Sequence, residues 1–273
     1  MIEKIQYVNH LNESLEFGKG RLYVNANDLR DFTWSFTGKN DRISGFKKGI
    51  VTKTIPVVLK ADSEEEGFAL RNRLFEVAEK DVLAVKHGRI TIGDYYLKCF
   101  VTESKKSEYL INKGYMRISL KVTTDFPFWI KEKTTNFFHG QASESKQLDY
   151  NRNYPYDYTS NMLGKQLIND DIVASNFRLV FYGACVNPAV VIGGHLYSVN
   201  TSVEAGEFLA VDSVQKTVVL MHKDGSTTNC FNLRSRDSYI FEKIPQGTSV
   251  VSTSSAFKLD VTLLEERSEP KWT

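Results

Sequence analysis

The 273-residue sequence has little of what most catalytic and metal sites are built from. It contains only three cysteines and five histidines. The cysteines are Cys99, Cys185 and Cys230. They are widely spaced, odd in number and set in apolar stretches, so we interpret them as buried thiols of a reduced protein rather than as disulfide or zinc partners. No pair of histidines has the i, i+4 spacing of a helical metal motif, which leaves no basis for a metal site. The five are His10, His87, His139, His195 and His222.

Long apolar runs and an excess of charge of either sign are also missing. No stretch approaches the roughly 20 uninterrupted apolar residues that span a membrane, and the N-terminal residues mix charged and apolar side chains. Lys+Arg 35 against Asp+Glu 33 gives a net charge of only +2. Specific nucleic-acid binding needs a clustered positive excess, so it is disfavoured. We expect a soluble protein made in a cytoplasm, without membrane insertion.

Recognisable catalytic motifs are absent as well. The sequence has no nucleophile elbow, dinucleotide fingerprint or P-loop. Gly193-Gly194-His195 would let a backbone approach a ligand closely, but no strand-to-helix context follows, so we interpret it as a tight hairpin turn. Several carboxylates would form a glycosidase pair only if folding placed two of them about 5–9 Å apart, and we interpret them as solvated charges. They are Asp170, Asp171, Asp260, Glu265 and Glu266. We predict no catalytic, cofactor-binding or metal-binding residue, and the ligand-binding residues stay unknown.

What the sequence does have is strand-forming composition, with 41% hydrophobic and 12% aromatic residues. Runs of β-branched and aromatic residues bounded by Gly and Asn clusters predict strands. Pro56 within one run indicates an edge strand or a bulge. In the first half the predicted strands are 5–8, 22–24, 32–36, 51–59, 82–85, 95–101 and 115–123.

One helix is predicted in this half. Ser63-Glu64-Glu65-Glu66 has the form of a capping box, in which the Ser63 hydroxyl accepts from the Glu66 amide. Leu70, Leu74 and Val77 then recur at helical spacing, out to about Glu79. A single helix among strands is expected to lie against the sheet.

The second half again reads as strands, at short and regular spacing. Asp224-Gly225 lies between two of them and suggests a type I′ hairpin turn. The pattern is typical of an antiparallel β-sandwich. Its predicted strands are 177–182, 189–192, 195–199, 207–211, 217–221, 239–244, 248–253 and 257–264.

Between the two halves the periodicity is lost and Asn, Ser, Asp and Tyr increase. The sequence therefore predicts an N-terminal domain over 1–135, a connecting strap over 136–176 and a C-terminal β-sandwich over 177–273. Tyrosine rings have an apolar body and a polar tip, so they suit partly buried contacts between domains. The strap candidates are Tyr150, Tyr154, Pro155, Tyr156 and Tyr158.

Five segments in register, covering nearly the whole chain, resemble the distal tail (Dit) proteins of long-tailed siphophages and their prophage relatives. The segments are "DLRDFTWSF" (28–36), "IGDYYLKCFVTESKKSEYLINKGYMRISLKVTTDFPFWI" (92–130), "YPYDY" (154–158), "NPAVVIGGHLYSVN" (187–200) and "RDSYIFEKIPQGTS" with the C-terminal "LLEERSEPKWT".

This resemblance implies a mainly β fold, with an N-terminal β-rich domain that carries the helix and a galectin-like or carbohydrate-module-like C-terminal sandwich. It implies a structural virion protein at the tail tip, made in the bacterial host cytoplasm. Six copies would form a ring through which DNA passes without being bound. The ring would join the tail tube protein to the tail-associated lysin or tip protein, and in many phages it also anchors the receptor-binding protein.

Two other functions compete with this structural hub. A carbohydrate-binding adhesin would hold host cell-wall saccharide on aromatic side chains of the C-terminal sandwich. An enzyme such as a wall hydrolase would need a carboxylate pair in a cleft. The oligomeric mass in solution distinguishes the structural hub from the adhesin and the enzyme, because only the hub is expected to form a cyclic assembly.

Overall fold

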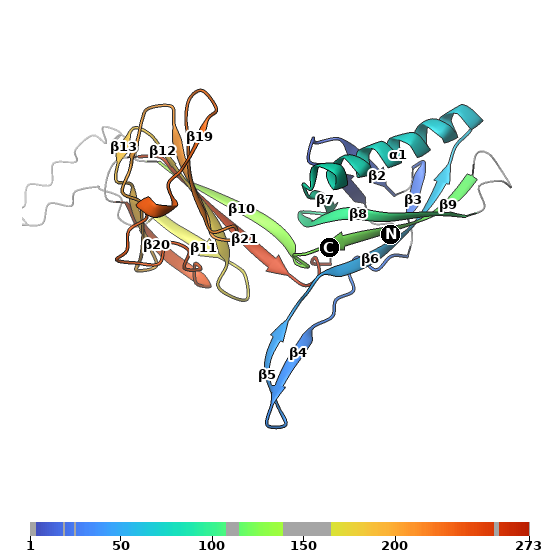
Figure 1. Ribbon diagram of the computed structural model, residues 1–273. Coiled ribbons are helices and arrows are strands. Elements are labelled where there is room, and N and C mark those ends of the chain that lie inside the picture. Colours follow the sequence, from blue (N-terminus) through green and yellow to red (C-terminus); the bar gives the residue numbers. More distant parts are fainter. Residues whose placement is uncertain are drawn as a thin grey trace, which may run out of the picture. The chain divides into compact units, whose positions relative to one another are not determined.

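The structure is a computed structural model that describes residues 4–18, 20–24, 26–107, 115–138, 165–253 and 257–272. It is mainly β, as the sequence predicts, with one α-helix and large antiparallel sheets (Figure 1). The described residues form two compact units. Unit 1 comprises residues within 1–131 and 266–273, and unit 2 comprises residues within 132–265.

The strand β11 (Lys165–Asn169) lies within the range expected as a strap, and the residues from Glu266 onward belong to unit 1. The strap candidates Tyr150, Tyr154, Pro155, Tyr156 and Tyr158 all lie outside the described residues. Their role as interdomain contacts therefore stays a prediction.

Unit 1 contains two antiparallel sheets that share one long strand, and a separate two-stranded hairpin, β4-β5. In one sheet the order is β2-β1-β7-β8, and in the other it is β3-β6-β9-β8. The first half of β8 pairs with β7, the second half pairs with β9, and the register shifts between Val101 and Glu103. A strand that changes sheets at a bulge makes a corner, so the two sheets enclose a common core. The strands are β1 (Ile5–Val8), β2 (Ser14–Phe17), β3 (Leu22–Val24), β4 (Ser35–Lys39), β5 (Arg42–Lys47), β6 (Val51–Lys60), β7 (Gly88–Ile92), β8 (Tyr95–Ser107) and β9 (Tyr115–Thr124).

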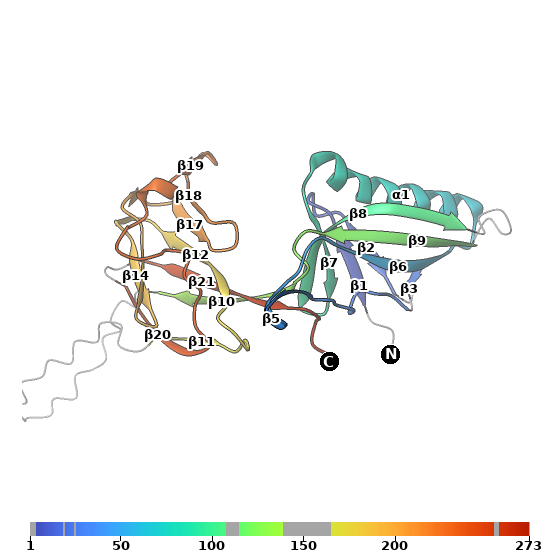
Figure 2. The ribbon, with the colours of Figure 1, turned by 60° about the horizontal axis from the view of Figure 1, so that its bottom comes forward.

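Helix α1 (Glu64–Ala84) covers this core (Figures 1 and 2). Its N-terminus is capped by the predicted Ser63, whose side chain accepts a hydrogen bond from the Glu66 amide at 3.1 Å. The Glu66 carboxylate accepts from the Asp62 amide instead of the Ser63 amide that a standard capping box would use. Three glutamates in the first turn also suit the positive end of the helix dipole.

The prediction of a strand over 82–85 is wrong, because α1 continues through Ala84. Val85 ends it with a left-handed backbone, φ 52°, and donates its amide to the Asp81 and Val82 carbonyls. Val82 and Val85 favour strands on their own, but buried contacts of Asp81 hold the last turns helical. Tertiary structure overrides local propensity here.

Pro56 lies in β6, which pairs with β9 along its whole length and with β3 only over Val57–Leu59. Amide groups two residues apart point to the same side of a strand. The amides of Thr54 and Lys60 donate to acceptors on the side of β6 away from β9. The nitrogen of Pro56 faces that same side, one residue beyond the segment that pairs with β3. Its missing amide proton therefore removes no hydrogen bond between strands. The expected edge position is confirmed locally.

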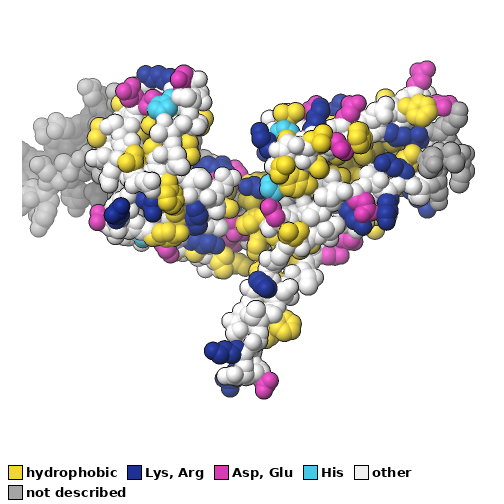
Figure 3. All heavy atoms as spheres, in the orientation of Figure 1, with side chains coloured by type: hydrophobic (Ala, Val, Ile, Leu, Met, Phe, Trp, Pro, Cys, Tyr) yellow, Lys and Arg dark blue, Asp and Glu magenta, His cyan; other side chains and the backbone are white. Residues whose placement is uncertain are grey.

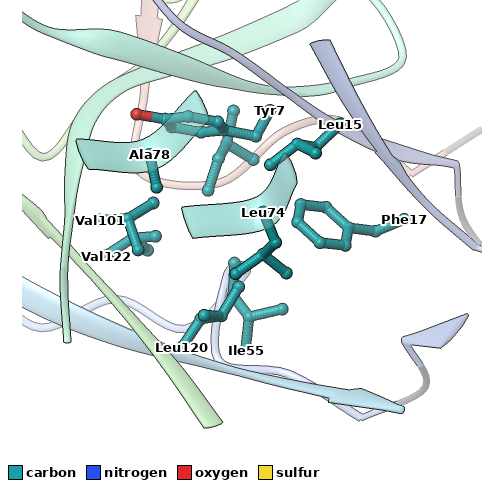
Figure 4. Close-up of a pocket in the computed structure, with 10 residues that line it drawn as sticks. Tyr7, Leu15, Phe17, Ile55, Leu74, Ala78, Val101, Leu120 and Val122 are labelled. Atoms are coloured by element: carbon teal, nitrogen blue, oxygen red, sulfur yellow. The ribbon is translucent and has the colours of Figure 1, made fainter. Parts of the chain in front are cut away.

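The core of unit 1 lies between α1 and the two sheets. Figure 4 shows Leu74 of α1 among side chains of both sheets, including Phe17, Ile55 and Leu120. The remaining space has a volume of about 10 Å³ and an apolar lining. That is at most room for one water, so this cavity is a packing gap and not a ligand site.

Unit 2 is an antiparallel β-sandwich, as predicted. Its larger sheet has the order β19-β18-β17-β12-β21-β10, and the smaller sheet has the order β11-β20-β14-β15. Alternate side chains of both sheets, among them Phe177, Leu209 and Val251, form one core. The other elements are β12 (Asn176–Tyr182), β13 (Cys185–Val186), β14 (Ala189–Ile192), β15 (His195–Ser198), β16 (Ser202–Val203), β17 (Phe208–Asp212), β18 (Thr217–Met221), β19 (Thr227–Asn229), the 3-10 helix η1 (Phe231–Leu233) and β20 (Gly247–Thr253).

Two strands carry the chain from one unit to the other. They are β10 (Trp129–Phe137) and β21 (Leu259–Arg267). Unit 2 is therefore inserted, in sequence, into unit 1.

Two local predictions in unit 2 are wrong. Residues 239–244 form turns instead of a strand, with the Glu242 amide donating to the Tyr239 carbonyl. Ile240 and Phe241 are both buried there, so their apolar character serves the core and not a ladder. The predicted type I′ turn at Asp224-Gly225 would need positive φ at both residues, but only Gly225 has it, within a turn from His222 to Gly225.

We expect Leu74→Ala to lower the free energy of unfolding by about 2–5 kcal/mol, because the side chain is buried at the centre of unit 1. Chemical denaturation followed by fluorescence measures this. The matched control is Phe75→Ala, since the neighbouring Phe75 is 56% exposed. Equal destabilisation by the two substitutions would contradict the helix orientation.

Candidate functional site: the hairpin arm and its base

The strands β4 and β5 form a hairpin that projects from unit 1 (Figure 1). We call residues 35–47 the arm. Lys39 pairs with Arg42, and the two residues between them, Asn40 and Asp41, have φ of 52° and 61°. Positive φ at both positions is the type I′ turn, which asparagine and aspartate tolerate and which matches the twist of two strands. The local sequence therefore specifies the turn of the hairpin.

The arm has one apolar side, which we call the arm face. Phe36 and Phe46 are directly paired across the strands, and Ile43 pairs with Gly38, two residues further along the same side. The other side carries Thr37, whose carbonyl accepts from Ser44. Phe36 is 66% exposed, Phe46 63% and Ile43 58%. The arm thus shows three large apolar side chains to its surroundings.

The base of the arm is a cluster of aromatic rings around Lys48. The Lys48 Nζ lies 4.7 Å from the centre of the Trp34 ring, 4.5 Å from that of Phe128 and 5.6 Å from that of Phe32. Trp34 also contacts Phe46 and Phe128 edge-on. The ring faces attract the ammonium, which holds the start of the arm against the body of unit 1.

Two hydrogen bonds complete the Lys48 site. Its Nζ donates to the Pro127 carbonyl at 3.2 Å and to the Ser268 hydroxyl at 2.8 Å. Burial away from water, helped by the nearby positive charge of Lys53, lowers the pKa of Lys48 to about 8. The residue is still mostly protonated at neutral pH, so the cation is present where the rings can bind it.

The C-terminal residues 268–272 also contact the rest of unit 1. Arg30 donates to the Pro270 carbonyl at 2.6 Å, and its guanidinium lies 3.8 Å from the centre of the Trp272 ring. Lys53 donates to the carbonyls of Asp28 and Asp31 in the segment that leads into the arm. Residues far apart in the sequence therefore converge at the arm base.

A second buried network fixes helix α1. The carboxylate of Asp81, which is fully buried, accepts from the Tyr7 hydroxyl at 2.5 Å and from the His10 amide at 2.8 Å. Burial raises the pKa of the Tyr7 hydroxyl, and the hydrogen bond to Asp81 acts in the same direction. A Cβ at Gly88 would lie 2.2 Å from the Asp81 carboxylate, so only glycine fits there. This network determines which face of α1 points outward.

Within the described part of the chain, the residues that the sequence singles out do not converge on a catalytic site. Gly193 and Gly194 form the predicted tight turn, with φ of 56° and 86°, and His195 contacts the Tyr239 carbonyl. Among the carboxylates, Asp170 contacts Lys133 and Asp260 accepts from Tyr182. Asp171 is buried, not solvated as expected, because it accepts from the Ile172 amide and the Ser175 hydroxyl. Glu265 and Glu266 are half-buried neighbours on β21.

Three of the described histidines contact carboxylates instead of clustering with one another. They are His10 with Asp81, His87 with Asp125 and His222 with Glu207. His139 lies outside the described residues. Among the residues that the structure describes, no three His, Cys, Asp or Glu side chains gather in a way that could hold a metal ion.

All three cysteines are free thiols. Cys99 and Cys230 are buried as predicted, whereas Cys185 is only half-buried. Burial raises the pKa of Cys99 to about 12, which makes this thiol unreactive.

Unit 2 has a surface groove of about 240 Å³ beside η1. Its lining combines the half-buried Phe231 ring with the amide of Asn229 and the hydroxyl of Thr227. The Arg234 guanidinium lies over the same ring, 4.0 Å from its centre. A ring edged by an amide and hydroxyl groups can stack on and hydrogen-bond to a polar ring-shaped ligand.

The whole chain is similar in structure to phage tail components. One match is a protein of the phage P2 baseplate in its activated conformation with calcium, with a TM-score of 0.64 and 12% identity over 99% of this chain and 100% of that chain. A second is a protein of the same baseplate with strontium, with a TM-score of 0.60, 14% identity and the same shares of both chains. The third is the SPP1 Dit protein, described as a paradigm of the hub adsorption apparatus in phages that infect Gram-positive bacteria. It has a TM-score of 0.59 and 11% identity over 97% of this chain and 99% of that one.

This chain has the Dit fold. The likeness extends over both units, as the five resembling sequence segments imply. No family model and no curated protein sequence matches the chain. The chain thus shares its fold with these structures at sequence identities of only 11–14%. Within the described part of the Dit fold, no helix is long and apolar enough to cross a membrane.

We expect Lys48 to titrate near pH 8, against an ordinary value of 10.5. Between these values the unfolded chain binds more protons than the folded one, so the free energy of unfolding rises with pH through this window. Below pH 8 both states are protonated and the burial penalty is fully present. Nitrogen-15 NMR of the Lys48 ammonium measures the midpoint directly.

The matched control for this titration is Lys48→Met, which keeps a long side chain in the ring cluster and has no titrating group. The wild type is expected to gain stability relative to this variant between pH 8 and 10.5. Parallel stability curves for the two proteins over that range would contradict the assignment.

Proposed function

We propose that this chain is a structural distal tail protein of a phage or prophage. Six copies form a ring at the tail tip, which joins the tail tube protein to the tail-associated lysin or tip protein and anchors a receptor-binding protein. The likeness to baseplate and Dit hub proteins over 97–99% of the chain is the observation that supports it. The protein would be made in the bacterial cytoplasm and would act without catalysing a reaction.

The surface of unit 1 agrees with a role in assembly. The arm is a two-stranded ribbon, and such a ribbon is marginally stable in water unless it packs against something else. Its exposed Phe36, Ile43 and Phe46 form an apolar surface of the kind that marks protein contacts. Figure 3 shows hydrophobic side chains exposed both on the arm and over α1.

The charge of the chain agrees with a passive conduit for DNA. A net charge of +2 on 273 residues provides no general attraction for phosphate groups. A ring lumen that DNA crosses quickly should not bind it tightly. The proposed function therefore includes no specific nucleic-acid binding.

The ring is tested by native mass spectrometry of the purified protein up to high concentration. Six chains of 31.1 kDa give about 187 kDa, and we expect this species together with a central hole in negative-stain images. A protein that only forms dimers with two-fold symmetry would contradict the ring.

A second candidate function is recognition of host cell-wall saccharide by unit 2, which the groove at Phe231 and Asn229 favours. If it holds, the intact protein binds wall polysaccharide, and Asn229→Ala weakens this binding about tenfold by removing one of the polar groups that line the groove. Calorimetry with purified wall fragments measures it. Asn200→Ala, at an exposed position outside the groove, is the matched control, and an equal loss in both variants would rule the groove out.

A further inference from the structure

We propose that the arm of one chain docks on the outward face of helix α1 of a second copy. This inference rests on the proposed ring, and it specifies which two surfaces meet. It concerns unit 1 alone.

The arm needs a partner outside its own chain. Among the residues that the structure describes, its two strands pair only with each other, and every residue of both strands is exposed except the half-buried Gly45. The arm face therefore contributes nothing to the core of its own unit. An amphipathic ribbon of this kind gains stability only when another surface covers its apolar side.

Helix α1 has an apolar stripe that its own core does not use. Its inward face consists of Leu74, Val77 and neighbouring buried residues. Phe68, Phe75 and Val82 follow one another at intervals of seven, which places them along one side of the helix. They are 49%, 56% and 42% exposed. We call these three residues the helix stripe.

The charges around the two surfaces are opposite. The arm carries Lys39, Arg42 and Lys47 against a single acid, Asp41, which gives it a net charge of +2. Helical geometry places Glu65, Glu76 and Glu79 beside the helix stripe. On its other side Arg71 lies over the Phe68 ring. Complementary charge of this kind selects the partner and sets its orientation.

The arm and the helix stripe of one chain cannot meet each other. In both ribbon views α1 lies on one side of unit 1 and the arm leaves from another (Figures 1 and 2). A contact between them must therefore join two copies. Because the two surfaces differ, each copy offers one of each, and repeated head-to-tail contact closes into a ring when the rotation allows.

The direct test removes apolar side chains from one surface at a time. Phe36→Ala with Phe46→Ala on the arm, or Phe68→Ala with Phe75→Ala on the helix, is expected to weaken self-association at least tenfold each. All four residues are exposed, so the fold survives, as circular dichroism will verify. Leu11→Ala, at another exposed site in unit 1, is the matched control and should leave association unchanged.

Mixing the two variants distinguishes this contact from a symmetric one. The arm variant keeps an intact helix stripe, and the helix variant keeps an intact arm, so together they can form one sound contact. Native mass spectrometry should show a 1:1 pair that does not grow further. Arm-to-arm or helix-to-helix docking predicts no such mixed pair.

Charge reversal tests the same contact independently. Lys39→Glu with Arg42→Glu should weaken association about tenfold, and adding Glu76→Lys with Glu79→Lys to the same chain should restore most of it. Failure of this rescue would contradict the orientation of the contact. Wild-type association should also fall as salt rises.

A photo-crosslinking residue in place of Phe46 shows whether this contact or the ring itself is wrong. A crosslink to residues 64–84 of another copy is the expected result. If the wild type forms its ring but the crosslink maps elsewhere, the ring stands and this contact is wrong. If the wild type stays monomeric at millimolar concentration, both are wrong.

Discussion

The position of Lys48 is the constraint on which the placement of the arm depends. One ammonium group is held by three ring faces, the Pro127 carbonyl and the Ser268 hydroxyl. Those partners come from the segment before the arm, the segment before β10 and the segment after β21. The same cation therefore holds together the base of the arm, the residues just before β10 and the residues just after β21.

The two ends of helix α1 are held in different ways. The N-terminus is set by local interactions, since Ser63 and Glu66 cap it within four residues. The C-terminal part is set by a buried carboxylate that binds Tyr7 and His10 from β1 and the residues just after it. A helix fixed in this way presents a constant outward face, which a docking surface between identical copies requires.

The parts of the fold that depend on local patterns could be predicted from the sequence. The cap at Ser63, the alternation along β9 and the Gly193-Gly194 turn each follow from residues within a few positions of one another. The end of α1 could not be predicted, because Asp81 keeps Val82 in the helix through contacts more than 70 residues away. The strand predicted over 239–244 was wrong for a similar reason. Ile240 and Phe241 are apolar because they are buried in the core, and not because they pair in a strand.

The candidate site was harder to predict than the fold. A strand near Phe36 and a turn near Asn40 are visible in the sequence, but their exposure is not, because aromatic residues usually indicate a core. Nothing in the local sequence around Lys48 indicates its role, because one of its partners, Ser268, lies 220 positions away in the chain. The likeness of distant segments to a known family indicated the fold without identifying these contacts.

The insertion of unit 2 within unit 1 has a consequence for biosynthesis. Residues 266–273 are translated after all of unit 2, yet they belong to unit 1. The ribosome must therefore release the whole sandwich before Ser268 can reach Lys48 and before Trp272 can reach Arg30. A nascent chain that has not yet released these last residues therefore has an incomplete arm base.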